Sequence, residues 1–171
     1  MDFRERIKRD PNPLQKLITA IPGFPGYLAR EQRRDADKLL REFLAGEIDA
    51  AGEAMERIAT RWSKAGAIDY LDDLEAIAGR LRRAADNLRY ADYGYAGFFD
   101  LVKINEEDLH RFYEYDLSLR GFIADIKGAI EALAEACGET IEETMISLDE
   151  SIDALADMID ERESVATDIA P

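Results

Sequence analysis

Between Pro25 and Pro171 the chain contains no proline, so no residue in that interval forces a helix to break. Apolar residues recur there at spacings of three and four, the period of a helix with one buried face. The first such run, from Tyr27 to Lys64, predicts one helix of roughly 57 Å. A helix with an apolar stripe of this length needs partners, because helices in water gain most of their stability from packing.

Three further segments show the same period. We expect helices from about Ala67 to Tyr90, from Asn105 to Cys137 and from Thr140 to about Ser164. Gly66 and Gly138 should end the helices before them, since glycine tolerates the left-handed conformation found at helix ends. Thr140 and Glu143 have the spacing of a capping box. The pattern predicts an all-α fold: an antiparallel up-down-up-down four-helix bundle with long helices and a short N-terminal helical arm.

The bundle should occupy residues 27–164, followed by a frayed tail at 165–171. The first and third helices are expected to be longer than the second and fourth. A long helix that extends past a shorter partner leaves part of its apolar stripe uncovered. This difference in length indicates a second chain, or coverage by the N-terminal residues.

Residues 1–26 form a separate basic and amphipathic arm that contains four of the five prolines and a short helix over 14–20. Three interpretations are open: the arm folds back and caps the bundle, docks on a partner, or lies on an anionic membrane surface. The basic residues that would contact an anion or a membrane are Arg4, Arg6, Lys8, Arg9 and Lys16.

The stretch from 91 to 104 is rich in aromatic residues and contains two glycines, which favour bends. So many aromatic side chains in a loop are either buried or form an exposed patch. One interpretation is a plug that closes one end of the bundle; the other is a loop that docks on a partner or touches a membrane. The candidate partner-binding residues are Tyr93, Tyr95, Phe98 and Phe99.

The charge is strongly acidic and unevenly placed. The chain carries a formal net charge of −15, and residues 1–41 contain ten Arg or Lys against six Asp or Glu, whereas residues 121–171 contain two against fourteen. An excess of acid repels phosphate, so we expect no nucleic-acid partner. No apolar run is long enough for a membrane span, and the charged N-terminus shows no signal core. A single cysteine excludes an internal disulfide and suits the cytoplasm.

Asp116 falls inside the apolar stripe of the third helix, between Phe112 and Leu119. A charged group there is costly unless it is paired. We expect a structural buried pair of Asp116 with Arg120, one turn further on. Other candidate partners are the arginines of the second helix (Arg80, Arg82, Arg83 and Arg89) and two neighbouring tyrosines (Tyr113 and Tyr115). A functional role for this carboxylate is the alternative.

Basic rows on the first helix lie beside Asp35 and Asp37 and have the pattern of a solvated face with local ion pairs; an anion or lipid-headgroup site is the alternative. They consist of Arg30, Arg33, Arg34 and Arg41.

Glu107 and His110 have the spacing used by di-iron bundles, yet they lie away from the apolar stripe of their helix, and no second Glu-x-x-His occurs. We therefore expect surface residues and no metal ligands. Cys137 has no histidine or cysteine beside it and should be a packed small residue. Phosphate-loop and nucleophile-elbow motifs are absent, so the sequence indicates no catalytic residue and no cofactor.

These observations favour a non-enzymatic interaction or scaffold module that binds a protein partner or itself. Two alternatives are a peripheral membrane adaptor that uses the basic arm and a carboxylate-metal oxidoreductase of the di-iron kind. The second would require several acidic residues to converge inside the bundle.

Overall fold

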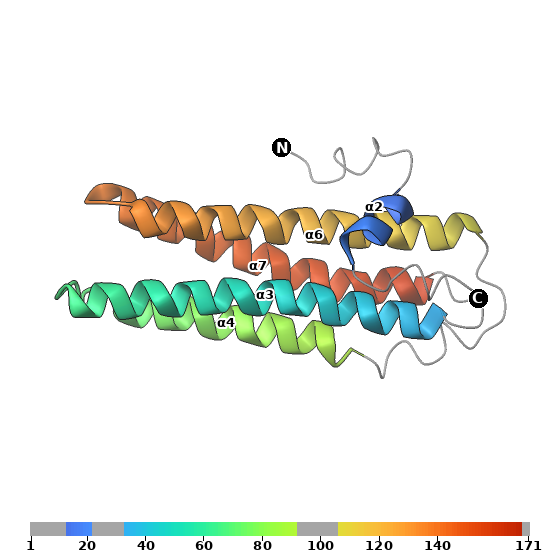
Figure 1. Cartoon of the computed structure of the whole chain (residues 1–171), viewed down its shortest axis with the longest axis horizontal. Coiled ribbons are helices and arrows are strands. Elements are labelled where there is room, and N and C mark those ends of the chain that lie inside the picture. Colours follow the sequence, from blue (N-terminus) through green and yellow to red (C-terminus); the bar gives the residue numbers. More distant parts are fainter. Residues whose placement is uncertain (1–12, 22–32, 92–105, 169–171) are drawn as a thin grey trace.

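A computed structural model describes residues 13–21, 33–91 and 106–168 of the chain (Figure 1). Every regular element in these ranges is an α-helix, as the sequence predicts. The helices are α2 (Pro13–Ala20), α3 (Arg33–Lys64), α4 (Leu71–Arg89), α6 (Glu106–Glu135) and α7 (Glu139–Asp168). The four long helices form a bundle, and the short α2 lies against its outside. None of the helices in the described part of the chain is both long enough and apolar enough to cross a membrane.

The bundle consists of two helical hairpins. Contacts join α3 to α4 and α6 to α7 within the hairpins, and α3 to α6 and α4 to α7 between them. Figure 1 shows that successive helices run in alternating directions along the long axis. The neighbours between the hairpins are therefore parallel, with α3 beside α6 and α4 beside α7. The grooves between α4 and α7 are consequently lined by two helices that begin at the same end of the bundle.

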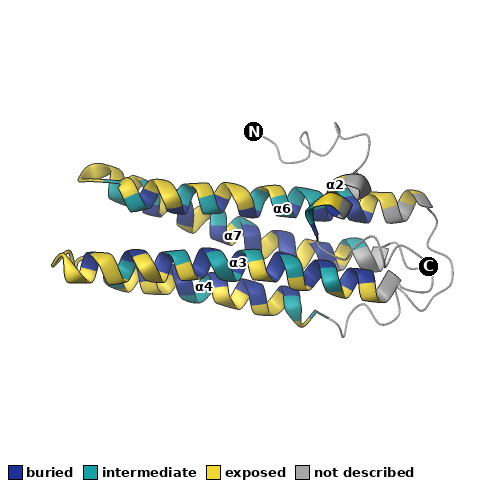
Figure 2. Ribbon diagram, in the orientation of Figure 1, coloured by how far each residue is buried: buried dark blue, intermediate teal, exposed yellow. Residues whose placement is uncertain are grey.

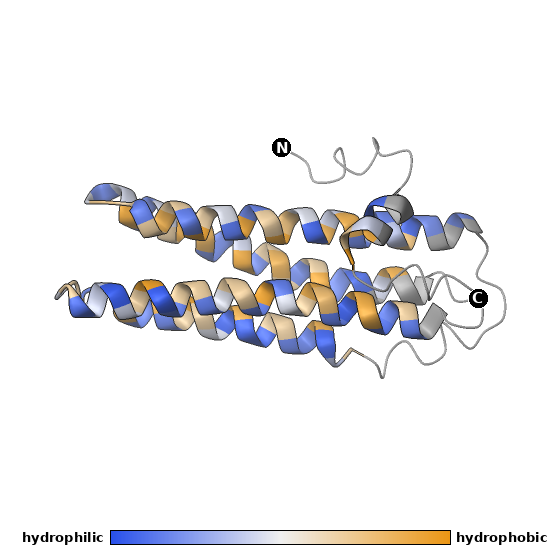
Figure 3. Cartoon of the chain, in the orientation of Figure 1, coloured by the Kyte–Doolittle hydropathy of each residue, from blue (hydrophilic) through white to orange (hydrophobic). Residues whose placement is uncertain are grey.

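The core follows the predicted apolar stripes, which turn inward while the charged faces point outward (Figures 2 and 3). The buried positions of α4 show the period of three and four: Leu74, Ile77, Ala78, Leu81, Ala84, Ala85 and Leu88. Each large aliphatic side chain removed from water in this way stabilises the fold by about 1.5–3 kcal/mol. Gly52 of α3 faces α4, where an added Cβ would lie 3.7 Å from the carbonyl oxygen of Ala78.

The hairpin turns depend on glycine. Gly66 follows α3 with a φ of 80°, and Gly138 precedes α7 with a φ of 59°, which is the left-handed region that glycine occupies at little cost. The capping box predicted from Thr140 is wrong, because α7 begins one residue earlier at Glu139. The hydroxyl of Thr140 instead donates to the carbonyl oxygen of Cys137 at 2.7 Å and accepts from its backbone N–H.

The expectation that the fourth helix is shorter than the third is also wrong. α7 has 30 residues, the same length as α6, and continues beyond Ser164 to Asp168. The predicted end followed the last apolar residue of the stripe, Ile159, but the next buried position is Arg162, with a side chain that is fully buried. A buried charged residue thus continues the stripe by one turn.

The helix of the N-terminal arm, α2, packs against α6. The side chains of Leu17 and Ile21 are buried in this contact, whereas Lys16 is exposed. Residues 13–21 of the arm therefore lie against the bundle, and whether the arm caps one end of it stays a prediction. The predicted contact residues Arg4, Arg6, Lys8 and Arg9 lie outside the described residues.

Candidate functional site

Asp116 lies in the interior of the bundle with none of its surface exposed, as its position in the stripe predicts. Its partner is Arg162 of α7 and not Arg120, which is only half-buried. The Nε atom of Arg162 donates to Oδ1 of Asp116 at 2.6 Å, and Nη2 donates to Oδ2 at 3.0 Å. This two-point contact is the strong geometry between a guanidinium and a carboxylate. The prediction that Arg120 is the partner of Asp116 is therefore wrong, and the partner is Arg162.

The pair belongs to a larger buried charge cluster, which we define as Asp37, Arg41, Asp116 and Arg162. Nη2 of Arg162 also donates to Oδ1 of Asp37 at 2.8 Å, and Oδ2 of Asp37 accepts from Nε of Arg41 at 2.8 Å. Nη1 of Arg41 donates at 2.8 Å to the carbonyl oxygen of Arg89, the last residue of α4. The cluster therefore ties all four long helices together, and it supplies a cation to one of the carbonyls that a helix end leaves unsatisfied.

Two carboxylates face two guanidiniums, so the buried charge cluster carries no net formal charge. Burial raises the pKa of Asp116 above its ordinary value, and the charge and hydrogen bonds of Arg162 oppose that rise. The ring of Phe112 lies 4.6 Å from the guanidinium carbon of Arg162 and adds a cation–π contact. Next to the cluster, the hydroxyl of Tyr115 donates to the carbonyl oxygen of Met158 at 2.7 Å.

The interpretation of Arg41 and Asp37 as part of a solvated face is wrong, because their exposed fractions are 1% and 3%. Both positions directly follow apolar residues of the stripe, Ala36 and Leu40. They lie on the flank of that stripe, where the neighbouring helices cover them. The signal that could have identified Arg162 is its place in the series Leu155, Ile159, Arg162, which continues the spacing of the stripe.

The buried charge cluster offers no opening for a substrate, since its side chains are at most 3% exposed. Elsewhere in the described ranges, no group of three or more His, Cys, Asp or Glu side chains is placed to hold a metal ion. Glu107 and His110 are both exposed, and Nε2 of His110 lies 3.5 Å from Oε1 of Glu114. Cys137 is exposed, contrary to the prediction that it packs, because it lies in the turn that joins α6 to α7.

The outer surface of the bundle is hollowed between α4 and α7 by a groove of about 610 Å³, which we call the acidic groove. Its floor and walls contain the apolar residues Ala76, Ile77, Met145 and Ile146. Ile146 is 56% exposed and is the one exposed large apolar side chain among the described residues that line this groove. The charged residues that line the groove are Asp73, Arg80, Glu142, Asp149 and Glu150.

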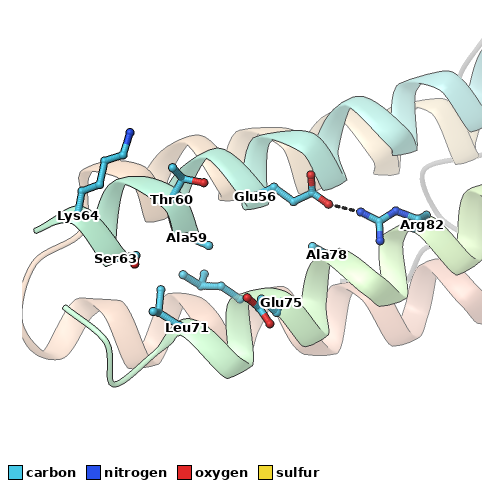
Figure 4. A pocket seen from close by; sticks show the side chains of 10 residues that line it. Glu56, Ala59, Thr60, Ser63, Lys64, Leu71, Glu75, Ala78 and Arg82 are labelled. Atoms are coloured by element: carbon cyan, nitrogen blue, oxygen red, sulfur yellow. Dashed lines mark hydrogen bonds and ion pairs between the residues drawn. The ribbon is translucent and has the colours of Figure 1, made fainter. Parts of the chain in front are cut away.

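A second groove lies between α3 and α4 near the hairpin turn and has a volume of about 630 Å³ (Figure 4). Its charges balance, with Glu56 and Glu75 opposed by Lys64 and Arg82. Figure 4 shows Glu56 and Arg82 pointing toward one another, and they form an ion pair that connects the two helices. This groove thus has neither the exposed isoleucine nor the excess of acid that distinguishes the acidic groove.

The sequence-based candidates for partner binding lie elsewhere. Tyr93, Tyr95, Phe98 and Phe99 fall outside the described residues. The acidic groove was not predicted, because it depends on which faces of α4 and α7 meet. The one available signal was Ile146, an isoleucine one position after the stripe residue Met145. Comparisons of this chain with protein-family models, with curated proteins and with solved structures found no match.

Proposed function

We propose that this chain is a non-enzymatic interaction module that binds another protein through the acidic groove between α4 and α7. The observation that carries the proposal is the exposed Ile146, which lines a groove on the outside of the bundle together with Met145 and Ile77.

The rest of the bundle supports a scaffold role. The buried charge cluster ties the four helices at one end, and the acidic groove lies toward the other end, where α4 and α7 begin. Arg80 connects the two walls of the groove, because it forms ion pairs with Asp149 and Asp153 of α7. Beneath these surface pairs the walls are held by the core, where Ile77 of α4 and Met145 of α7 are buried. The groove is therefore formed before a partner arrives, which reduces the entropy lost on binding.

The same features argue against a catalytic role and are consistent with the expected location. The interior carboxylates are neutralised by arginines and are closed to solvent. The exposed thiol of Cys137 suits a reducing compartment, so the proposal retains the cytoplasm as the location of the protein.

Site-specific photocrosslinking tests the proposal. A photoreactive amino acid replaces Ile146 in the full chain, and the matched control carries it at Ile68, an isoleucine that is 65% exposed and lies outside the groove. We expect one discrete protein adduct from the position of Ile146 that the control does not give. The captured protein, once purified, should form a complex of defined mass with the unmodified chain by light scattering. Equal labelling at both positions, or no adduct at either, refutes the proposal.

A further inference from the structure

We infer that the occupant of the acidic groove is a basic amphipathic helix of a partner protein, about two turns long at the contact. The inference depends on the proposed function, since it names the class of partner that the groove receives. It follows from three properties of the groove: the length of its lining along the helix axis, the charges beside its apolar residues, and the charge of the helix that forms one wall.

The residues that line the groove have helical spacing on both walls. On α7 the lining residues are Glu142, Met145, Ile146, Asp149 and Glu150, and on α4 they are Asp73, Ala76, Ile77 and Arg80. α4 and α7 are in contact and run in the same direction (Figure 1), so the lining residues of both helices follow one another in the same direction along the groove. From Glu142 to Glu150 is about 12 Å along the helix axis. That length matches two turns of a docked helix with one or two apolar anchors at a spacing of three or four.

On α7, acidic residues lie both before and after the apolar residues of the groove. Glu142 lies one turn before Met145 and Ile146, and Glu150 lies one turn after them. Among the described residues, Glu142, Glu150 and Asp73 make no ion pair. Arg80 is the single base that lines the described groove, and Asp149 and Asp153 already engage it. A docked helix therefore meets carboxylates that have no internal counter-charge.

Every exposed charged residue that the structure describes on α7 is acidic. Its only basic residue, Arg162, is fully buried and belongs to the buried charge cluster. The exposed acids of α7 are Glu139, Glu142, Glu143, Asp149, Glu150, Asp153, Asp157, Asp160 and Glu161. A field of one sign over a whole helix attracts a basic segment and repels an acidic one, which sets the choice of partner more than its affinity.

The partner helix that complements this surface has apolar anchors flanked by Lys or Arg one turn before and one turn after. The anchors lie against Ile146, Met145 and Ile77, and the flanking cations lie near Glu142 and Glu150. An acidic or neutral amphipathic helix offers the same apolar anchors, but it places negatively charged or uncharged groups beside the carboxylates.

Peptide binding to the full chain tests this inference. The probes are three fluorescent peptides: a Leu/Lys amphipathic helix, its Leu/Glu counterpart, and a scrambled Leu/Lys peptide without an apolar face. Fluorescence anisotropy at low salt should show saturable binding of the first peptide only, and the affinity should fall as salt rises. Equal binding of the scrambled peptide, which would indicate charge alone, or of the Leu/Glu peptide refutes the inference.

Two matched pairs of variants locate the binding. Glu150→Lys should weaken binding on the order of fivefold, because it replaces an attraction with a repulsion. Its control, Glu131→Lys, makes the same change of charge on the exposed face of α6, outside the groove, and should have little effect. Ile146→Ser should also weaken binding by about fivefold or more, whereas Ile68→Ser should not. Equal effects within either pair contradict the inference.

The outcomes separate this inference from the proposed function. A protein adduct at Ile146 together with no binding of the Leu/Lys peptide means that the groove is an interface with another kind of partner, so only the inference fails. A groove-dependent dimer in light scattering, abolished by Glu150→Lys, would assign the groove to a second copy of the chain and would overturn both the inference and the proposed binding of another protein. No adduct and no peptide binding would remove both.

Discussion

Replacing Arg162 with methionine should destabilise the bundle more than any other single change in the buried charge cluster. Both hydrogen bonds that Asp116 accepts from described residues come from Arg162, and Arg162 donates a third hydrogen bond to Asp37. Methionine keeps much of the volume of the side chain but none of its charge. The substitution therefore leaves Asp116 buried without its counter-charge, while Asp37 keeps Arg41 at 2.8 Å.

Removing one partner of a buried ion pair costs about 3–5 kcal/mol. Small proteins lose about 1–3 kcal/mol of stability per molar urea. A loss of about 4 kcal/mol therefore moves the midpoint of urea unfolding of Arg162→Met down by about 2 M, measured by circular dichroism. Arg83→Met is the control, because Arg83 is an exposed arginine of α4, and it should change the free energy of unfolding by no more than about 0.5 kcal/mol.

The pH dependence gives a second readout. Burial raises the pKa of Asp116 on folding, and Arg162 opposes the rise, so in Arg162→Met this pKa is higher still. A carboxyl group with a raised pKa binds more protons in the folded state, so its contribution to stability falls as pH rises from the unfolded pKa through the folded one. The destabilisation of Arg162→Met should therefore be smaller at pH 5 than at pH 7, by at most about 1.4 kcal/mol per pH unit.

A double variant completes the test. Adding Asp116→Leu to Arg162→Met replaces the buried pair with apolar side chains and removes the uncompensated charge. Such replacements are often neutral or stabilising, so the double variant should recover most of the lost stability. The reasoning is refuted if Arg162→Met costs less than about 1 kcal/mol at pH 7, or if its cost does not change between pH 7 and pH 5.

Two further predictions concern single hydrogen bonds and turns. Tyr115→Phe removes the bond to the carbonyl oxygen of Met158 and should cost about 1–1.5 kcal/mol in chemical unfolding, whereas Tyr90→Phe, at an exposed site, should cost nothing measurable. Because burial raises the pKa of Tyr115, its contribution falls as pH rises above about 10, and the Phe variant should lose less stability there. Gly128→Ala, at a site on α6 where an added Cβ meets nothing, should raise the stability in thermal unfolding by about 0.5–1 kcal/mol. Gly138→Ala, at a φ of 59°, should lower it by about 1–2 kcal/mol. A change of the same sign in both variants would contradict this account.

The buried charge cluster also bears on how the hairpins choose their register. Asp116 and Arg162 meet only when α6 and α7 are aligned, and Asp37 joins them only when α3 is aligned as well. A slip of one turn along the bundle would bury charges without partners, which costs more than the displaced apolar contacts. The cluster thus favours one alignment among apolar stripes that are otherwise similar.

The amino-acid sequence determined the helices and most of their inward faces. The absence of proline after Pro25, the spacing of three and four, and the glycines at 66 and 138 are local features, and local geometry is enough to interpret them. For the same reason Asp116 could be recognised as a charge in an apolar stripe, because its own helix defines the stripe.

Only the tertiary structure decided which residues meet. Arg162 is 46 residues from Asp116 and 125 residues from Asp37, so their contacts depend on the arrangement of the hairpins rather than on any spacing along the chain. The acidic groove is of the same kind, because Ile77 of α4 and Ile146 of α7 come together through the parallel packing of the two hairpins. Periodicity states which face of a helix is buried, but the partner of a charge and the walls of a groove are properties of two helices at once.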